Sequence, residues 1–106
     1  MTRPSSEQQR VQLKAATRQA VRWVGTLEAA ARITGRSVPR LHAAGNVLDP
    51  DYFLPIDAAL DLDLDIGRPV VTTALAELQG YVLLHPGGAD DGTKIDLMVE
   101  TATASQ

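Results

Sequence analysis

The amino-acid sequence predicts an all-α protein, a compact bundle of five helices, on three observations. Residues that cap or stop helices punctuate the first 80 positions at intervals that suit short helices. Apolar side chains between these signals repeat at helical spacing. The chain has 106 residues, which is enough for one small domain. We therefore expect residues 1–84 to form the domain and residues 85–106 to form a flexible acidic tail.

The first helix is expected to run from about Ser6 to Val24, because Pro4 precedes it and Ser5 or Ser6 can cap it. Apolar side chains lie near one face of this helix, with Trp23 beside them: Val11, Ala15, Val21 and Val24. Basic side chains recur every four residues on another face: Arg10, Lys14, Arg18 and Arg22. Such a stripe is typical of a solvated surface and also of a surface that faces phosphate, and the spacing alone leaves both interpretations open.

Two shorter helices follow the first. Thr26 can cap a second helix, from Leu27 to Thr34, through its hydroxyl group. Gly35 then stands where the chain needs a residue with a left-handed backbone. Ser37 can cap a third helix, which is expected from about Val38 to Ala44.

Two further helices are expected, from about Pro55 to Ile66 and from about Pro69 to Gln79, each with a proline at its start and a glycine after its end. Residues 60–66 also alternate between apolar and acidic side chains, which is typical of a strand. The proline and glycine that bound this segment favour the helix. We expect the apolar run Tyr81–Leu84 to be extended and packed. Alternating residues in the tail could form one strand: Ile95, Leu97 and Val99.

Charge divides the chain into two halves. Residues 1–46 carry eight basic and two acidic side chains, a net charge of +6, whereas residues 47–106 carry two basic and eleven acidic side chains, a net charge of −9. The whole chain is slightly acidic, at −3, yet it has one basic half. DNA responds to the face that it meets rather than to the average charge. The pattern therefore favours nucleic acid as a partner of the N-terminal half.

Several classes of protein are not expected. The chain has no cysteine and only two histidines, His42 and His85, so we expect no disulfide, no metal and no cofactor. No catalytic triad or phosphate-binding loop is specified, so we expect no enzyme. No run approaches about 18 apolar residues and no secretory signal begins the chain, so we expect a cytoplasmic protein with no membrane partner. Asp61–Asp65 lacks the glycine and final acid of a calcium loop, and it indicates an acidic helix face or a protein-contact surface.

The segment from Thr26 to Gly45, TLEAAARITGRSVPRLHAAG, has the features of a helix-turn-helix. Ala30 and Ala31 are small where one helix would cross the other, Ile33 is an apolar anchor, and Leu41 is expected to point back into the core. Through the residues AARITGRSVPRL the segment resembles the helix-turn-helix of phage-type transcriptional regulators, the Cro and CII class.

One position departs from that pattern. Arg36 follows the turn glycine where many members of the class carry an aliphatic residue, and it offers an additional basic group to the DNA backbone. The segment DYFLPIDAALDLDLDIGRPVVTTALAELQGY also resembles the downstream part of small regulators found in prophages and gene-transfer-agent clusters of α-proteobacteria. This second resemblance implies a repressor or silencer of phage-like genes.

The resemblance implies that the third helix lies in the major groove of DNA. The base-contacting side chains would be Val38, Pro39, Arg40 and His42. Arg40 is the best candidate for direct recognition of a base, because a guanidinium group can form two hydrogen bonds with guanine. Contacts with the DNA backbone are expected from Arg18, Arg22, Thr26, Arg36, Ser37 and Asn46. The alternative is a small helical protein whose arginines only solvate its surface.

One such unit covers half of a binding site, so the resemblance implies a homodimer on double-stranded DNA, associated with the nucleoid when bound. An alanine-rich core with few aromatic residues would also leave a monomer marginally stable. The dimer surface is expected in the apolar stripes of residues 55–66 and 69–79, with Tyr52, Phe53 and Tyr81–Leu84. The predicted function is sequence-specific repression of transcription. The alternative is a protein-interaction module, such as an antirepressor, an antitoxin or a co-regulator, whose acidic C-terminal half binds a second regulatory protein.

Overall fold

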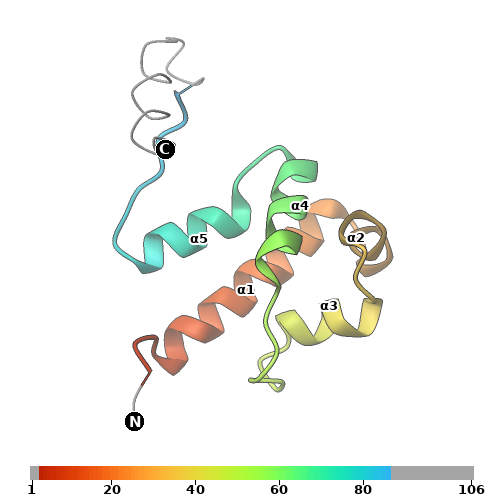
Figure 1. Ribbon diagram of the computed structural model, residues 1–106, viewed down its shortest axis with the longest axis horizontal. Helices are drawn as coiled ribbons and strands as arrows, with labels where there is room; N and C mark the ends of the chain where they lie inside the picture. Colours follow the sequence, from red (N-terminus) through yellow and green to blue (C-terminus); the bar gives the residue numbers. More distant parts are fainter. Residues whose placement is uncertain (1–2, 87–106) are drawn as a thin grey trace.

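The computed structural model describes residues 3–86, and this part of the chain contains five α-helices and no strand. The helices are α1 (Glu7–Val24), α2 (Leu27–Thr34), α3 (Val38–Gly45), α4 (Ile56–Ile66) and α5 (Val70–Leu78) (Figure 1). The predicted all-α class is confirmed, and each helix begins and ends within one residue of its expected bounds. The strand alternative for residues 60–66 is wrong, because these residues lie in α4. The strand considered around Ile95 lies outside the described residues.

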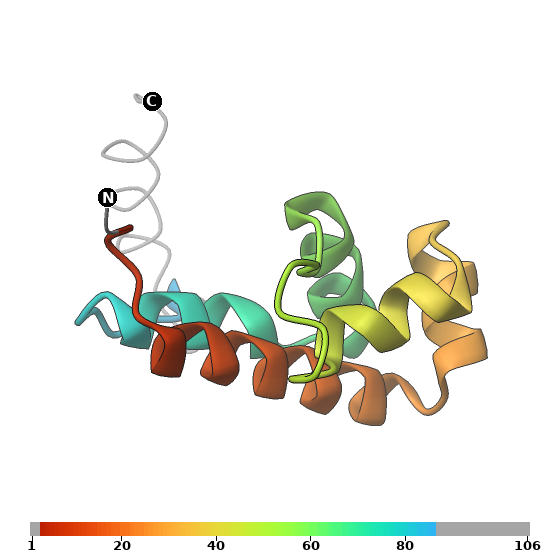
Figure 2. The same cartoon turned by 90° about the horizontal axis from the view of Figure 1, so that it is seen from below.

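The longest helix, α1, contacts each of the other four helices. Figures 1 and 2 show α5 lying beside α1 and running in the opposite direction. Figure 2 shows α2, α3 and α4 gathered over the C-terminal half of α1, whereas its N-terminal half has α5 as its neighbour. The α2–α3 pair therefore lies at the end of the molecule that holds the C-terminal half of α1.

The core is made largely of small side chains. Its buried members come from all five helices: Ala20, Ala30, Leu41, Ala59, Leu62 and Val71. Alanines allow helix axes to approach closely, although each contributes little buried apolar area. Gly45 marks the closest approach of α3 to α1, because a Cβ atom there would lie 2.8 Å from Cγ of Arg18. The expected inward positions of Ala30 and Leu41 are confirmed.

Side-chain caps explain where the first three helices begin. The hydroxyl oxygens of Ser6, Thr26 and Ser37 accept hydrogen bonds from backbone N–H groups three residues further on, at 3.0–3.3 Å. Each of these bonds satisfies one of the donors that a helix leaves free in its first turn. No residue at its own start caps α5 in this way.

The cap of α5 comes instead from α4. Asp63 is only 7% exposed, and its carboxylate accepts hydrogen bonds from the N–H groups of Val71 and Thr72, both at 3.0 Å, and from Oγ1 of Thr72 at 2.8 Å. A carboxylate is well suited to this place, because the start of a helix carries partial positive charge. The interpretation of Asp61–Asp65 as only a surface feature is therefore wrong at Asp63.

One expectation about apolar residues is also corrected. The run Tyr81–Leu84 forms neither helix nor strand, and its four side chains are exposed, so it is not packed against the rest of the described chain. In α4, Ile56 and Leu60, which belong to the apolar stripe expected at the dimer surface, are exposed. The helix buries Ala58, Ala59, Leu62 and Asp63, and it packs against α1, α2 and α5.

Candidate nucleic-acid interface

Helices α2 and α3 are joined by a three-residue turn, Gly35–Arg36–Ser37. Gly35 has φ 71°, in the left-handed region that glycine adopts without a steric penalty, and its N–H group donates to the carbonyl of Ala31. Oγ1 of Thr34 donates to the carbonyl of Ala30 at 2.8 Å and accepts from the N–H group of Arg36 at 3.2 Å. The turn is therefore held by local hydrogen bonds. Its role as a DNA-binding helix-turn-helix stays a prediction.

The first half of α3 faces outward. Pro39, Arg40 and His42 are exposed and Val38 is half-buried, so the expected base-contacting side chains stand at the surface to different degrees. The guanidinium carbon of Arg40 lies 6.0 Å from the centre of the Tyr52 ring, at the outer limit of a cation–π contact. Arg40 thus has an aromatic neighbour and still reaches solvent.

A hollow of about 390 Å³ lies where α1, the start of α2 and the end of α3 meet. Five of the expected DNA-contacting residues line it: Arg18, Arg22, Thr26, His42 and Asn46. Neither aspartate nor glutamate lines this hollow. The structure therefore brings together side chains 28 positions apart in the sequence, and their charge favours an anion.

The side chains of this hollow differ in how far they are already engaged. The guanidinium group of Arg18 donates to the carbonyl of Gly45 at 2.5 Å, and Oδ1 of Asn46 accepts from the N–H group of Leu48 at 3.0 Å. The Thr26 hydroxyl oxygen caps α2, which leaves its proton free to be donated. The side chain of Arg22 is exposed and forms no hydrogen bond or ion pair within residues 3–86.

Two residues that were expected to contact the DNA backbone, Arg36 and Ser37, lie outside this hollow. Arg36 forms an ion pair with Asp57 of α4, with 2.6 Å between Nη2 and Oδ1, so part of its charge is already balanced. Ser37 caps α3 through its hydroxyl oxygen. Both residues belong to the turn and do not line the hollow.

The four basic residues of α1 do not form one outward stripe, which corrects that expectation. Lys14 is only 2% exposed. Its ammonium group donates to the carbonyls of Ala43 at 3.0 Å and Ala44 at 3.1 Å, at the end of α3, and of Tyr52 at 2.5 Å. It also lies 4.4 Å from the centre of the Phe53 ring. Lys14 therefore joins three parts of the chain instead of facing phosphate.

Sequence periodicity could not separate Lys14 from its basic neighbours, because all four residues share the spacing of four. A weaker signal lay in its position three residues after Val11, near the edge of the apolar stripe. Burial lowers the pKa of the Lys14 ammonium, whereas Asp49 raises it and Arg18 lowers it further. Arg10 is half-buried, and its guanidinium group donates to the carbonyl and the hydroxyl oxygen of Ser5.

Within residues 3–86, no three histidine or acidic side chains lie close enough together to hold a metal ion. None of the five described helices is both long enough and apolar enough to cross a membrane.

Comparison with known proteins finds no relative, since no family model, curated protein or solved structure matches this chain.

Proposed function

We propose that this protein is a sequence-specific DNA-binding regulator of transcription, a repressor or silencer of phage-like genes that acts as a homodimer on promoter DNA. The observation that carries the proposal is the acid-free hollow between α1, α2 and α3, next to the outward face of α3. A phosphate group in this hollow would meet Arg22, the hydroxyl group of Thr26 and the first N–H groups of α2.

Phosphate contacts of this kind position a protein on DNA, whereas contacts with base edges determine the sequence that it prefers. With a phosphate in the hollow, α3 would lie along the major groove and present Pro39, Arg40 and His42 to the bases. Arg40 would supply the most specific contact, because its guanidinium group can form two hydrogen bonds with guanine. Repression would then follow because the bound protein occludes the promoter.

Replacing Arg40 with alanine is expected to cost about 1–3 kcal/mol of binding free energy for the specific site and to relax the preference at one base pair. The operator would first be identified by chromatin immunoprecipitation with sequencing. Fluorescence anisotropy on that duplex and on single-base variants then measures the change. Replacing Arg22 with alanine should weaken binding to all sequences alike and reduce the dependence of affinity on salt.

The matched control for both variants is Arg32→Ala. Arg32 is an exposed arginine of α2 that neither lines the hollow nor belongs to α3, so its loss should change affinity least. Unchanged binding of the specific site by the Arg40 variant would show that α3 is not the helix that contacts the bases. Failure of the parent protein to shift any promoter duplex would remove the proposal altogether.

A second candidate function, docking of another regulatory protein, is favoured by the exposed face of α4. Ile56, Leu60 and Leu64 recur every fourth residue and are 82%, 56% and 70% exposed. Asp57, Asp61 and Asp65 each follow one of them, so an aliphatic ridge runs beside an acidic edge. A basic amphipathic helix has the complementary surface, with apolar anchors flanked by lysine or arginine.

Replacing Leu60 and Leu64 together with serine is expected to weaken binding of such a helix at least tenfold, because the anchors would lose the apolar surface that they bury. The probe is a synthetic amphipathic peptide with leucines four residues apart and lysines beside them, compared with a scrambled peptide of the same composition. Both substituted side chains are exposed, so the fold and DNA binding should persist. Equal affinity for the two peptides would exclude this use of α4.

A further inference from the structure

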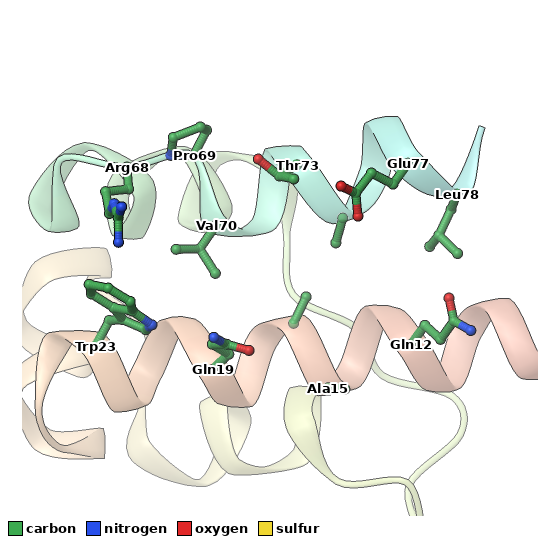
Figure 3. Close-up of a pocket in the computed structure, with 12 residues that line it drawn as sticks. Gln12, Ala15, Gln19, Trp23, Arg68, Pro69, Val70, Thr73, Glu77 and Leu78 are labelled. Atoms are coloured by element: carbon green, nitrogen blue, oxygen red, sulfur yellow. The ribbon is translucent and has the colours of Figure 1, made fainter. Parts of the chain in front are cut away.

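A groove of about 720 Å³ runs between α1 and α5. Figure 3 shows the two helices antiparallel, with Trp23 and Arg68 at one end of the groove and Gln12, Glu77 and Leu78 at the other. Between these ends the lining consists of the longer Gln19 and of small or short side chains: Ala15, Ala16, Val70, Thr73 and Ala74. The guanidinium carbon of Arg68 lies 4.9 Å from the centre of the Trp23 ring.

The groove contains two charged side chains, and they have opposite signs. Arg68 stands just before α5 and Glu77 near its end, nine residues later. From Val70 to Glu77 the helix rises about 10 Å at 1.5 Å per residue, and Arg68 lies two residues before Val70. Both side chains are exposed, and neither forms an ion pair within residues 3–86. The groove therefore has one positive end and one negative end.

We propose that a second copy of this chain occupies the groove and forms a symmetric dimer through the α1–α5 face. A two-fold axis that crosses both helices midway between Arg68 and Glu77 would place the two α5 helices antiparallel. Each Arg68 would then face Glu77 of the other copy. This face is complementary to itself under that rotation, as a two-fold interface requires. A partner helix of uniform charge would meet a like charge at one end.

The shape of the groove fits the same arrangement. Small residues in the middle allow helices of two copies to approach closely. Trp23 is exposed at the positive end, and the rotation would place its ring over the end that holds Gln12 and Leu78 in the other copy. A large aromatic side chain that fills a hollow in this way is a common anchor of protein interfaces.

The role of this dimer in DNA binding rests on the proposed function, in which a second copy supplies a second DNA-binding unit. The groove uses residues 12, 15, 16, 19 and 23 of α1, whereas the DNA-facing hollow uses residues 17, 18, 21 and 22. At 100° per residue these two sets fall on different faces of α1. Dimerisation through the groove therefore leaves both hollows open.

The test is reversal of the two charges, measured by sedimentation velocity without DNA at low salt over a range of protein concentrations. The parent protein should be a dimer at micromolar concentration. Arg68→Glu alone or Glu77→Arg alone should weaken the dimer at least about tenfold, because two attractive contacts become two repulsive ones. An equimolar mixture of the two variants should restore dimers, since every contact between unlike copies is then attractive. The double variant should also dimerise.

The restored pairing separates a lost interface from a lost fold, and circular dichroism of each variant provides an independent reading. Glu28→Arg and Arg32→Glu, at exposed positions of α2, make the same changes of charge outside the groove and should leave the dimer intact. A monomeric parent, single reversals without effect, or a mixture that stays monomeric would each overturn the proposal. A dimer that does not bind DNA would contradict the proposed function and leave this interface standing. A monomer that binds DNA would overturn this interface and leave the DNA-binding part of the proposed function standing.

Discussion

Replacing Lys14 with methionine is expected to lower the free energy of unfolding by about 2–4 kcal/mol, since the carbonyls of Ala44 and Tyr52 would lose the Lys14 donor and that of Ala43 would keep only the N–H group of Asn46. The ammonium group bonds to the carbonyls of Ala43, Ala44 and Tyr52 and lies over the ring of Phe53. Methionine can fill much of the same space but donates no hydrogen bond. The loss would loosen the end of α3 and the chain that follows it from α1.

The measurement is urea denaturation followed by circular dichroism, with Arg22→Met as the matched control. Arg22 lies two turns further along α1 and is exposed, so its replacement should change stability by less than about 0.5 kcal/mol. Equal stabilities of the Lys14 and Arg22 variants would show that the buried ammonium group does not hold α3 in place.

The same residue adds a dependence on pH. Burial lowers the pKa of Lys14 in the folded protein below its ordinary value of 10.5, which applies to the unfolded chain. Between these two values the unfolded chain binds more protons at this site than the folded protein does. The contribution of Lys14 to the free energy of unfolding therefore rises with pH through this alkaline window. Denaturation of the parent and of the Lys14→Met variant at several alkaline pH values should show a difference that grows with pH.

Replacing Asp63 with alanine should destabilise the protein by about 2–3 kcal/mol, because its buried carboxylate accepts three hydrogen bonds from the first turn of α5. The loss should be concentrated in α5 and in its packing on α1. Hydrogen exchange should therefore show amides of Val71 and Thr72 opening more readily than amides of α3.

Asp65→Ala is the control for this variant. It removes the same carboxylate from the same helix at an exposed position, and Asp65 accepts no hydrogen bond from a side chain or from α5 within the described residues. Its cost should stay below about 0.5 kcal/mol. If the two variants unfold at the same urea concentration, the tertiary cap contributes nothing measurable.

The bounds of the five helices could be predicted from the sequence, because the signals that set them are local. Ser6, Thr26 and Ser37 accept hydrogen bonds from N–H groups three residues away. Gly35 adopts the left-handed backbone that ends α2, and this conformation does not depend on distant contacts. The inward positions of Ala30 and Leu41 were expected from their places in the helix-turn-helix pattern of residues 26–45, which is also local in sequence.

The candidate interface was predictable only in part. Spacing places Pro39, Arg40 and His42 on the outer side of α3, because α3 buries Leu41 and Ala44. It does not show that His42 would share a hollow with Arg22 of another helix. Nor does it show that Arg36 would be paired with Asp57, 21 positions away.

By itself, then, the sequence determined where each helix begins and ends and that the basic residues belong to the N-terminal half. Only the tertiary structure decided which polar groups are structural and which are free. Lys14 and Arg22 belong to one series of basic residues spaced by four, and Asp61, Asp63 and Asp65 belong to one series of acidic residues spaced by two. Of these five side chains, only Lys14 and Asp63 are buried, and each caps another helix. The physical reason is that a side chain's burial depends on which helix packs over its face, and that neighbour is set by contacts between segments distant in sequence.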